Sequence, residues 1–441
     1  MNRNGSREET GFQAVKQQPP ASQTYPSMNW VLFLLSLSVL INYIDRSNLS
    51  IAAPLIKDEL NISASQLGTL LSAFFWTYAL MQIPAGWLVD RFDVKWVFAI
   101  GFFVWSSATA ITGVLHGFVA LLAVRVILGL GESVAMPSYS KILRSHFRES
   151  RRGFANAMLM VGLALGPALG VLVGGAVVSR FGWRSFFVAL GLAGMLWLVP
   201  WFFWMPTHTT PPDQSSSSPG GGYLPILRLR SAWGTCLGLA SINYYLYFLV
   251  TWLPFYLVRE RHLSLNEMAR KSAMLFLMSA AASAVCGKLS DRWILAGSSP
   301  TRVRKGMMLV GHAGVGAFLV GMTLTKGFTF LAMLALTGAC LGTAICNTWA
   351  IAQTLAGPSM IGRWVGVQNL VGNLGGALAP LVTGRLLDLT GSFHWPFYVT
   401  AVAAWVGAVG WCLVVGPLEE IDWRPYPPRV LPVEVRPAPQ T

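Results

Sequence analysis

The amino-acid sequence predicts an all-α membrane protein with 12 transmembrane helices in two pseudo-symmetric six-helix bundles. The first observation is composition: 54% of the 441 residues are hydrophobic and only 11% are charged, whereas a soluble domain carries roughly 25% charged residues. The second is that apolar stretches of about 20 residues, the length that crosses a bilayer as a helix, recur along the chain. The third is that short motifs of the first half return at equivalent places in the second half.

The predicted helices follow one another with short polar breaks, after a polar tail at 1–29. Those of the first bundle (30–205) lie near 30–52, 66–89, 96–114, 117–143, 153–179 and 184–205. Residues 206–230 contain TPPDQSSSSPGGG, which is too polar to cross lipid and predicts a linker. Those of the second bundle (231–417) lie near 232–258, 268–290, 303–325, 328–350, 362–386 and 392–416. The last segment, 418–441, is Pro-rich and is expected to be a disordered tail.

The positions of the basic residues predict the orientation in the membrane. If both termini lie inside, 21 of the 32 Lys and Arg residues fall in inner segments, 9 in outer loops and 2 within helices. The positive-inside rule then places both termini and the linker in the cytoplasm. The net charge of +14 is thereby explained without nucleic-acid binding. We expect a multi-pass protein of the inner (plasma) membrane, in contact with the lipid bilayer.

The sequence lacks the motifs that are typical of metal sites, disulfide-linked proteins and several classes of enzyme. The five cysteines lie in or beside apolar segments, with no CxxC or Cys/His spacing, so neither a metal site nor a disulfide is expected. The sequence has no Walker loop, GxSxG or HExxH motif. We therefore expect no cofactor and no enzymatic activity.

The two halves share motifs at corresponding helices. GWLVDR at 86–91 ends the second helix and GKLSDR at 287–292 ends the eighth. LGPALGVLVGG at 165–175 and LGGALAPLVTG at 374–384 are identical at seven of eleven positions. A duplicated six-helix unit is typical of membrane transporters, in which the substrate site lies between the repeats near the midplane.

Four ionisable residues stand out within predicted helices, where charge costs a few kcal/mol at least and indicates function. Asp45 and Arg125 lie about 10 and 12 Å below the outer face, and these depths predict an ion pair. Glu132 lies two turns beyond Arg125 and has no obvious permanent partner. A buried carboxyl disfavours the charged form, so Glu132 is the main candidate proton carrier. Arg46, rotated about 100° from Asp45, can face a central cavity and bind a carboxylate. A static charge network remains the alternative.

The motifs together resemble the major facilitator superfamily. The resemblance rests on GWLVDR with Lys95, RVILGLG at 125–131 and GLALGPALG at 162–170. It narrows toward the anion:cation symporter family through INYIDRSNLSIAAP, GESVAMPSYSK, RRGFAN and FGWRSFF. That family includes proton-coupled importers of sugar acids such as galactonate, glucarate and hexuronates, and eukaryotic sialic-acid and glutamate carriers. The resemblance implies that Arg46 holds the substrate carboxylate and that Asp45 and Glu132 handle protons.

Neutral polar side chains are also needed for a sugar acid. The candidates in the second bundle include residues 243–247, Asn347 and residues 368–373. The resemblance favours Tyr43, Tyr78, Trp349 and Asn369 as cavity residues. We add Asn373 to this set. Helix-to-helix hydrogen bonding is the alternative for each.

Three other positions in the helices carry expectations of their own. Cys346 and Leu163 stand where relatives often carry polar groups, which implies a substrate with fewer or differently placed hydroxyls. His312 is expected to be structural.

The repeated loop motif predicts a cytoplasmic gate, in which a carboxylate caps a neighbouring helix or pairs with arginine. The gate residues are Gly86, Asp90, Arg91, Asp291 and Arg292. Asp93 and Val94 depart from the family pattern and leave the strength of this latch open.

The sequence thus predicts a monomeric secondary transporter that works by alternating access and imports an organic anion by proton symport. An aldonate or hexuronate is the expected substrate. The alternatives are an exporter of drugs or other organic solutes, or a non-transporting membrane sensor. An exporter of cations predicts an acidic or apolar cavity, and a sensor needs an output domain that the tails and linker do not provide.

Overall fold

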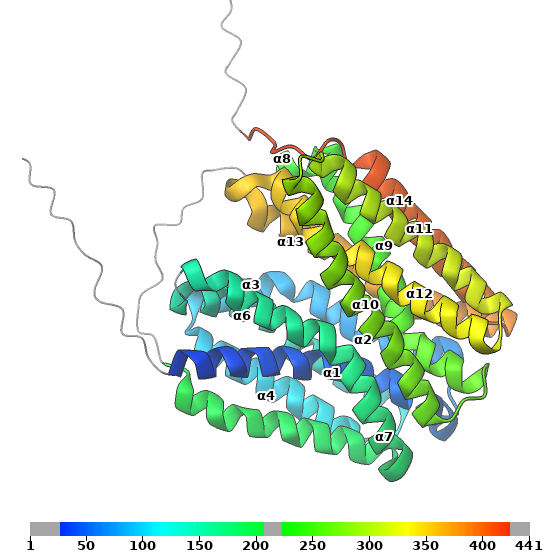
Figure 1. Cartoon of the computed structure of the whole chain (residues 1–441). Helices are drawn as coiled ribbons and strands as arrows, with labels where there is room; N and C mark the ends of the chain where they lie inside the picture. The colour runs from blue at the N-terminus through cyan, green and yellow to red at the C-terminus, as the bar shows by residue number, and fades with distance from the viewer. Residues whose placement is uncertain (1–26, 148, 207–222, 424–441) are drawn as a thin grey trace, which may run out of the picture.

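A computed structural model describes residues 27–147, 149–206 and 223–423 (Figure 1). A few side chains inside helices, including that of Asp90, lie outside the description. Residues 1–26 of the predicted tail and most of the predicted linker also fall outside it, whereas residues 27–29 already belong to the first helix. The described part of the chain contains helices and no strand.

The helices follow the predicted order, with interruptions inside several spans. In the first half they are α1 (Ser27–Leu60), α2 (Ala64–Leu80), α3 (Gln82–Arg91), α4 (Val94–Thr112), α5 (Phe118–Glu132), α6 (Ala135–His146) and α7 (Glu149–Trp204). In the second half they are α8 (Leu224–Leu227), α9 (Arg230–Arg259), α10 (Leu265–Leu295), α11 (Pro300–Leu324), α12 (Gly327–Ile345), α13 (Thr348–Thr390) and α14 (His394–Val409), followed by a π-helical turn at Gly410–Val414.

Ten segments of the described chain are long and apolar enough to cross a membrane. The twelve predicted spans are recovered once two breaks are considered. The second span is divided into α2 and α3 at Met81. The segment Val161–Trp204 holds the fifth and sixth spans, because Gly182 has a φ of 79° and interrupts α7. A positive φ of this kind favours glycine.

Local sequence signals explain where several helices begin. Ser63 and Gln66 form a capping box at the start of α2, and Ser264 and Glu267 form another at the start of α10. Asp93 accepts a hydrogen bond from the backbone of residue 95 at the start of α4. These caps satisfy amide groups that the helix itself leaves unpaired.

Two parts of the chain differ from the expectation of polar, unstructured segments. Residues 224–227 of the predicted linker form the short helix α8. Residues 418–423 of the predicted tail pack on the second bundle: the Trp423 indole donates to the Ala356 carbonyl at 2.8 Å, and Leu418 is buried. The apolar Leu418, Ile421 and Trp423 explain this packing, because their burial is favourable.

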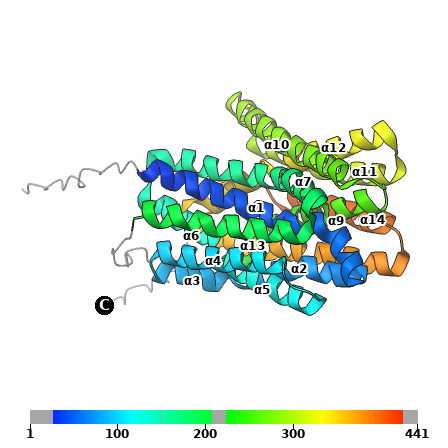
Figure 2. The same ribbon diagram turned by 90° about the horizontal axis from the view of Figure 1, so that it is seen from below.

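The helices form two bundles, α1–α7 and α8–α14 (Figures 1 and 2). The bundles meet through three helix pairs, α2 with α13, α7 with α10, and α1 with α9. We call the end at which α1 begins, α7 ends and α9 begins the linker end, and the opposite end the distal end. The exact residues at which each bundle begins and ends stay predictions.

Contacts between the bundles concentrate at the distal end. The Asp388 carboxylate accepts hydrogen bonds from the backbone amides of Ala64 and Ser65 at 2.9 and 2.8 Å. Arg259 forms an ion pair with Asp58. Arg46, Ser72 and Ser179 also form hydrogen bonds across the bundles, and these contacts lie between the level of Arg46 and the distal end. Toward the linker end the two groups of helices diverge (Figure 1).

Candidate functional site

Arg46 lies in the middle of α1 and forms an ion pair with Glu132 at the end of α5. Its Nη2 atom is 3.2 Å from one Glu132 oxygen and its Nε atom is 3.4 Å from the other. The two side chains are 6% and 1% exposed. The expectation that Glu132 lacks a partner is therefore wrong. Position along a helix does not reveal which partner a long arginine side chain can reach.

The position of Glu132 depends on a close approach of α5 and α2. A Cβ atom at Gly129 would lie 2.6 Å from the Phe74 carbonyl oxygen, so only glycine allows this packing. Gly129 is three residues before Glu132, on the same side of the helix. The glycine thus brings the carboxylate beside the aromatic side chains of α2.

Asp45 is buried on the other side of α1 and is held by neutral groups. It accepts hydrogen bonds from the Asn48 amide at 3.1 Å and from the Thr109 hydroxyl at 3.2 Å. Arg125 donates to the Asn48 carbonyl oxygen at 3.3 Å. The predicted direct Asp45–Arg125 ion pair is wrong for this structure, because Asn48 lies between the two charges. Asn48 was missed, although its place one turn from Asp45 was visible in the sequence.

Aromatic rings surround the Arg46 guanidinium. Its carbon lies 5.0 Å from the ring centre of Tyr43, 4.7 Å from that of Tyr78 and 5.2 Å from that of Phe74. Rings at these distances attract a cation and shield it from water. Tyr43 and Tyr78 are thus beside Arg46, whereas Phe74 was not singled out from the sequence.

A contact across the bundles completes this arrangement. The Arg46 Nη1 atom donates to the hydroxyl of Tyr247 in α9 at 3.1 Å. The sequence INY at 41–43 returns at 242–244, which aligns Tyr247 with Arg46 in the duplicated unit. This repeat was a signal that could have identified Tyr247 within the candidate segment 243–247.

A cavity of about 220 Å³ lies against Arg46 between the bundles. Tyr43, Arg46 and Trp349, three of the candidate substrate-binding residues, line it. The first bundle also contributes Leu163 and Pro167. The remaining lining side chains come from the second bundle and are mostly apolar: Leu239, Ile242, Asn243, Leu246, Tyr247, Val250, Phe276, Ser279, Ala280, Ser283, Leu341, Ile345 and Thr348. Tyr78, Asn369 and Asn373 are not among its lining residues.

The predicted gate residues are separated from the opposite bundle in this conformation. Arg91, Asp291 and Arg292 are exposed, and no atom of a neighbouring segment lies within 4 Å of the Cβ position at Gly86. The side chain of Asp90 lies outside the described part. The gate therefore stays a prediction.

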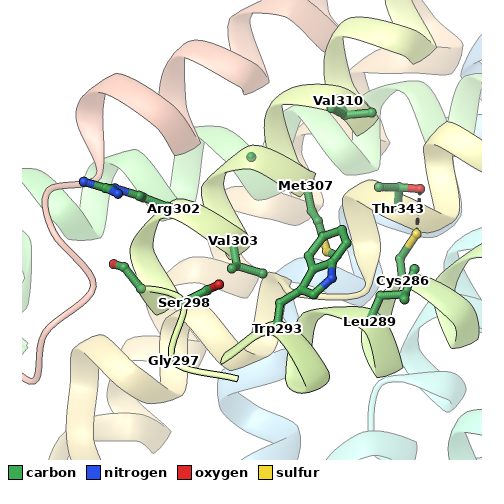
Figure 3. Close-up of a pocket in the computed structure, with 12 residues that line it drawn as sticks. Cys286, Leu289, Trp293, Gly297, Ser298, Arg302, Val303, Met307, Val310 and Thr343 are labelled. Carbon is green, nitrogen blue, oxygen red and sulfur yellow. Dashed lines mark hydrogen bonds between the residues drawn. The ribbon is translucent and has the colours of Figure 1, made fainter. Parts of the chain in front are cut away.

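A larger cavity of about 750 Å³ lies away from this charge cluster, at the linker end of the second bundle. It is a groove between α10 and α11, in which Trp293 and Met307 lie side by side and Arg302 extends away from them (Figure 3). The Cys286 thiol and the Thr343 hydroxyl are 3.4 Å apart at one side. The groove contains none of the buried charges, so the cavity beside Arg46 is the candidate site.

A cavity with buried charges between two pseudo-symmetric helical bundles defines a membrane transport protein. The chain belongs to the Major Facilitator Superfamily, whose family model matches residues 35–380 and 272–440. It is 28% identical over 404 residues to a probable L-galactonate transporter of Escherichia coli, covering 87% of this chain and 88% of that protein. It is 30% identical over 419 residues to a probable sulfoacetate transporter of Cupriavidus necator, covering 91% and 96%.

Solved structures support the same fold. A bacterial homologue of the human lysosomal transporter Spinster has a TM-score of 0.74 at 22% identity, covering 89% of this chain and 97% of that one. The comparisons confirm the predicted helical fold and the resemblance to sugar-acid transporters of the superfamily.

Proposed function

We propose that this protein is a secondary active transporter that imports an organic anion together with protons by alternating access. The observation that carries the proposal is the position of Arg46, whose guanidinium both pairs with Glu132 and lines the cavity. A planar, permanently charged guanidinium suits a carboxylate. The relatives named for L-galactonate and for sulfoacetate share an anionic substrate, which supports an anion here.

The shared guanidinium provides a mechanism for coupling. A buried charge is costly without a partner, so Glu132 in its ionised form competes with a substrate anion for Arg46. Protonation of Glu132 releases Arg46 and allows the anion to bind. By linkage, the bound anion also favours the protonated form of Glu132 by the same factor. Anion and proton are therefore carried together.

Asp45 is proposed as a second proton site, linked to the first by the buried polar chain through Asn48 and Arg125. Asp45, Asn48 and Arg125 are each less than 5% exposed. Arg125 and Glu132 lie in the same helix, α5. A change in the charge of Asp45 would alter the electrostatic interactions of Arg125 and would thereby affect α5. Proton transfer at Asp45 would thereby accompany a conformational step.

The charge distribution favours a cytoplasmic linker end, and on this proposal the conformation described here is the inward-facing one. The bundles close the distal side through Asp388 and Arg259 and separate where the predicted gate residues lie. The outward-facing state would require the distal contacts to break and the linker ends to meet. We propose that the monomer performs this cycle in the inner membrane.

Uptake by proteoliposomes with an imposed inward proton gradient tests the proposal, with labelled galactonate, glucuronate and sulfoacetate as probes. We expect at least one acid to accumulate, and Arg46→Ala to abolish its uptake. Arg302→Ala in the groove is the matched control and should transport normally. Absence of accumulation in sealed vesicles that contain folded protein, together with the failure of every tested acid to bind the purified protein, would contradict anion import.

The Glu132→Gln variant tests the coupling step separately. It mimics the protonated carboxyl, so Arg46 remains available and exchange of substrate down its gradient should persist. Proton-driven accumulation should be lost. Unchanged accumulation would remove Glu132 from the coupling mechanism.

A further inference from the structure

The cavity beside Arg46 is lined mainly by apolar side chains, with a smaller number of neutral groups that could bind the hydroxyls of a sugar acid. We propose that the substrate of this protein is a small carboxylate with an apolar body, such as a single ring, and few or no hydroxyl groups. This inference rests on the proposed function, because it concerns the anion that Arg46 would hold.

The apolar surface of the cavity comes from both bundles. Leu163 and Pro167 of α7 form one part, and Phe276, Leu341 and Ile345 are among the side chains that form the other. Side chains of this kind favour apolar ligand surface, because its transfer from water is favourable. The cation at Arg46 and the apolar surface together suit an amphipathic anion.

The polar groups that line the cavity are partly engaged. The Thr348 hydroxyl donates to the Ala344 carbonyl in its own helix at 3.3 Å, and the Tyr247 hydroxyl accepts from Arg46. Asn243, Ser279, Ser283 and the Trp349 indole are the remaining polar side chains of the second bundle at the cavity, and Tyr43 adds a hydroxyl from the first. A hexuronate carries several hydroxyls, each both donor and acceptor. Those that face the apolar wall would be left unpaired, at a cost for each.

The volume limits the size of the ligand rather than its polarity. About 220 Å³ is below the range of about 300–1,000 Å³ that is usual for sites of drug-sized molecules. The aromatic side chains of Tyr43, Phe276 and Trp349 give such a small ligand flat surfaces to pack against. We therefore expect one ring or a short chain beside the carboxylate.

Calorimetric titration of the purified full-length protein tests this inference, with phenylacetate and glucuronate as probes at a mildly acidic pH. Binding is measured rather than uptake, because neutral apolar acids cross lipid bilayers unaided. We expect phenylacetate to bind at least about tenfold more tightly than glucuronate, since a mainly apolar site disfavours a ligand with several hydroxyls by this order or more. Arg46→Ala should abolish the binding of phenylacetate.

Substitution of Leu163 tests the role of the apolar wall. Leu163→Gln adds an amide to the cavity and should reduce the preference for phenylacetate over glucuronate several-fold. Leu163→Met keeps the wall apolar and serves as the control, which should retain the wild-type preference. A preference that Leu163→Gln leaves unchanged would contradict this role.

The outcomes separate this inference from the proposed function. If glucuronate binds as tightly as phenylacetate or more tightly, and requires Arg46, the apolar-body inference is overturned and anion transport stands. If neither acid binds and no acid is accumulated by proteoliposomes, both fail. Binding of phenylacetate that persists in Arg46→Ala would also overturn the assignment, because the carboxylate would not be held at this site.

Discussion

Asp388 provides a direct test of how the distal side is held closed. Its carboxylate accepts two backbone hydrogen bonds at the start of α2, from Ala64 and Ser65, although it belongs to α13 of the other bundle. These bonds can exist only while the bundles touch at the distal end. We predict that Asp388→Ala shifts the conformational equilibrium away from the state described here.

The expected size of the shift follows from the geometry. Loss of a side chain that caps a helix N-terminus costs about 0.5–2 kcal/mol, and loss of a negative charge at that terminus costs about 0.3–1 kcal/mol. Because Asp388 is exposed to solvent, we take about 1–2 kcal/mol for both effects together. The ratio of the two conformations should then change by a factor of about 5–30.

Pulsed electron paramagnetic resonance can measure this ratio, with spin labels at the exposed distal positions Asn61 and His394 in the two bundles. We expect Asp388→Ala to increase the population with a long distance between the labels. Gln66→Ala is the matched control, since the Gln66 side chain belongs to the cap of the same helix and contacts only its own bundle there. Distance distributions that stay the same in Asp388→Ala, or that change equally in Gln66→Ala, would refute the reasoning.

Three further predictions concern stability and can be measured by thermal unfolding of the purified variants. Asn48→Ala removes the amide between a buried acid and a buried base, and we expect a loss of about 2–4 kcal/mol; an unchanged melting temperature would show that these charges find other partners. Gly375→Ala places a Cβ against the backbone of Ala240, and overpacking of this kind should cost about 1–3 kcal/mol, whereas full stability would mean that α9 and α13 can separate. Trp423→Ala removes a hydrogen bond to Ala356 and half-buried aromatic surface, and should cost about 1–2 kcal/mol; no loss would contradict a structural role for residues 418–423.

The sequence was sufficient to predict the helices and the buried charged residues inside them. Apolar length identifies spans because the bilayer imposes it, and Arg46 and Glu132 stand out because charge is costly in lipid. Their pairing could not be predicted. Depth along a helix is readable from residue number, but the direction of a side chain and the rotation of its neighbour depend on packing, as the close contact at Gly129 shows.

Other features depended on contacts that are remote in sequence. Phe74 is one of several aromatic residues in its helix, and only the packing of α2 against α1 places it beside Arg46. Trp423 lies in a segment rich in proline, where composition argues for disorder. Its indole nevertheless donates to the carbonyl of Ala356 in α13, which lies 67 residues earlier in the sequence. In both cases the deciding partner lies far along the chain, and local composition does not report it.

The unequal composition of the cavity has a consequence for how such proteins diverge. The ionisable residues Asp45, Arg46, Arg125 and Glu132 all belong to the first bundle, whereas most of the cavity wall belongs to the second. If the proposed mechanism holds, substitutions in the second bundle would change the molecule that is carried while leaving the groups proposed to carry protons intact. Gene duplication followed by drift in that half would give new cargo specificities without the need to reinvent the energy source.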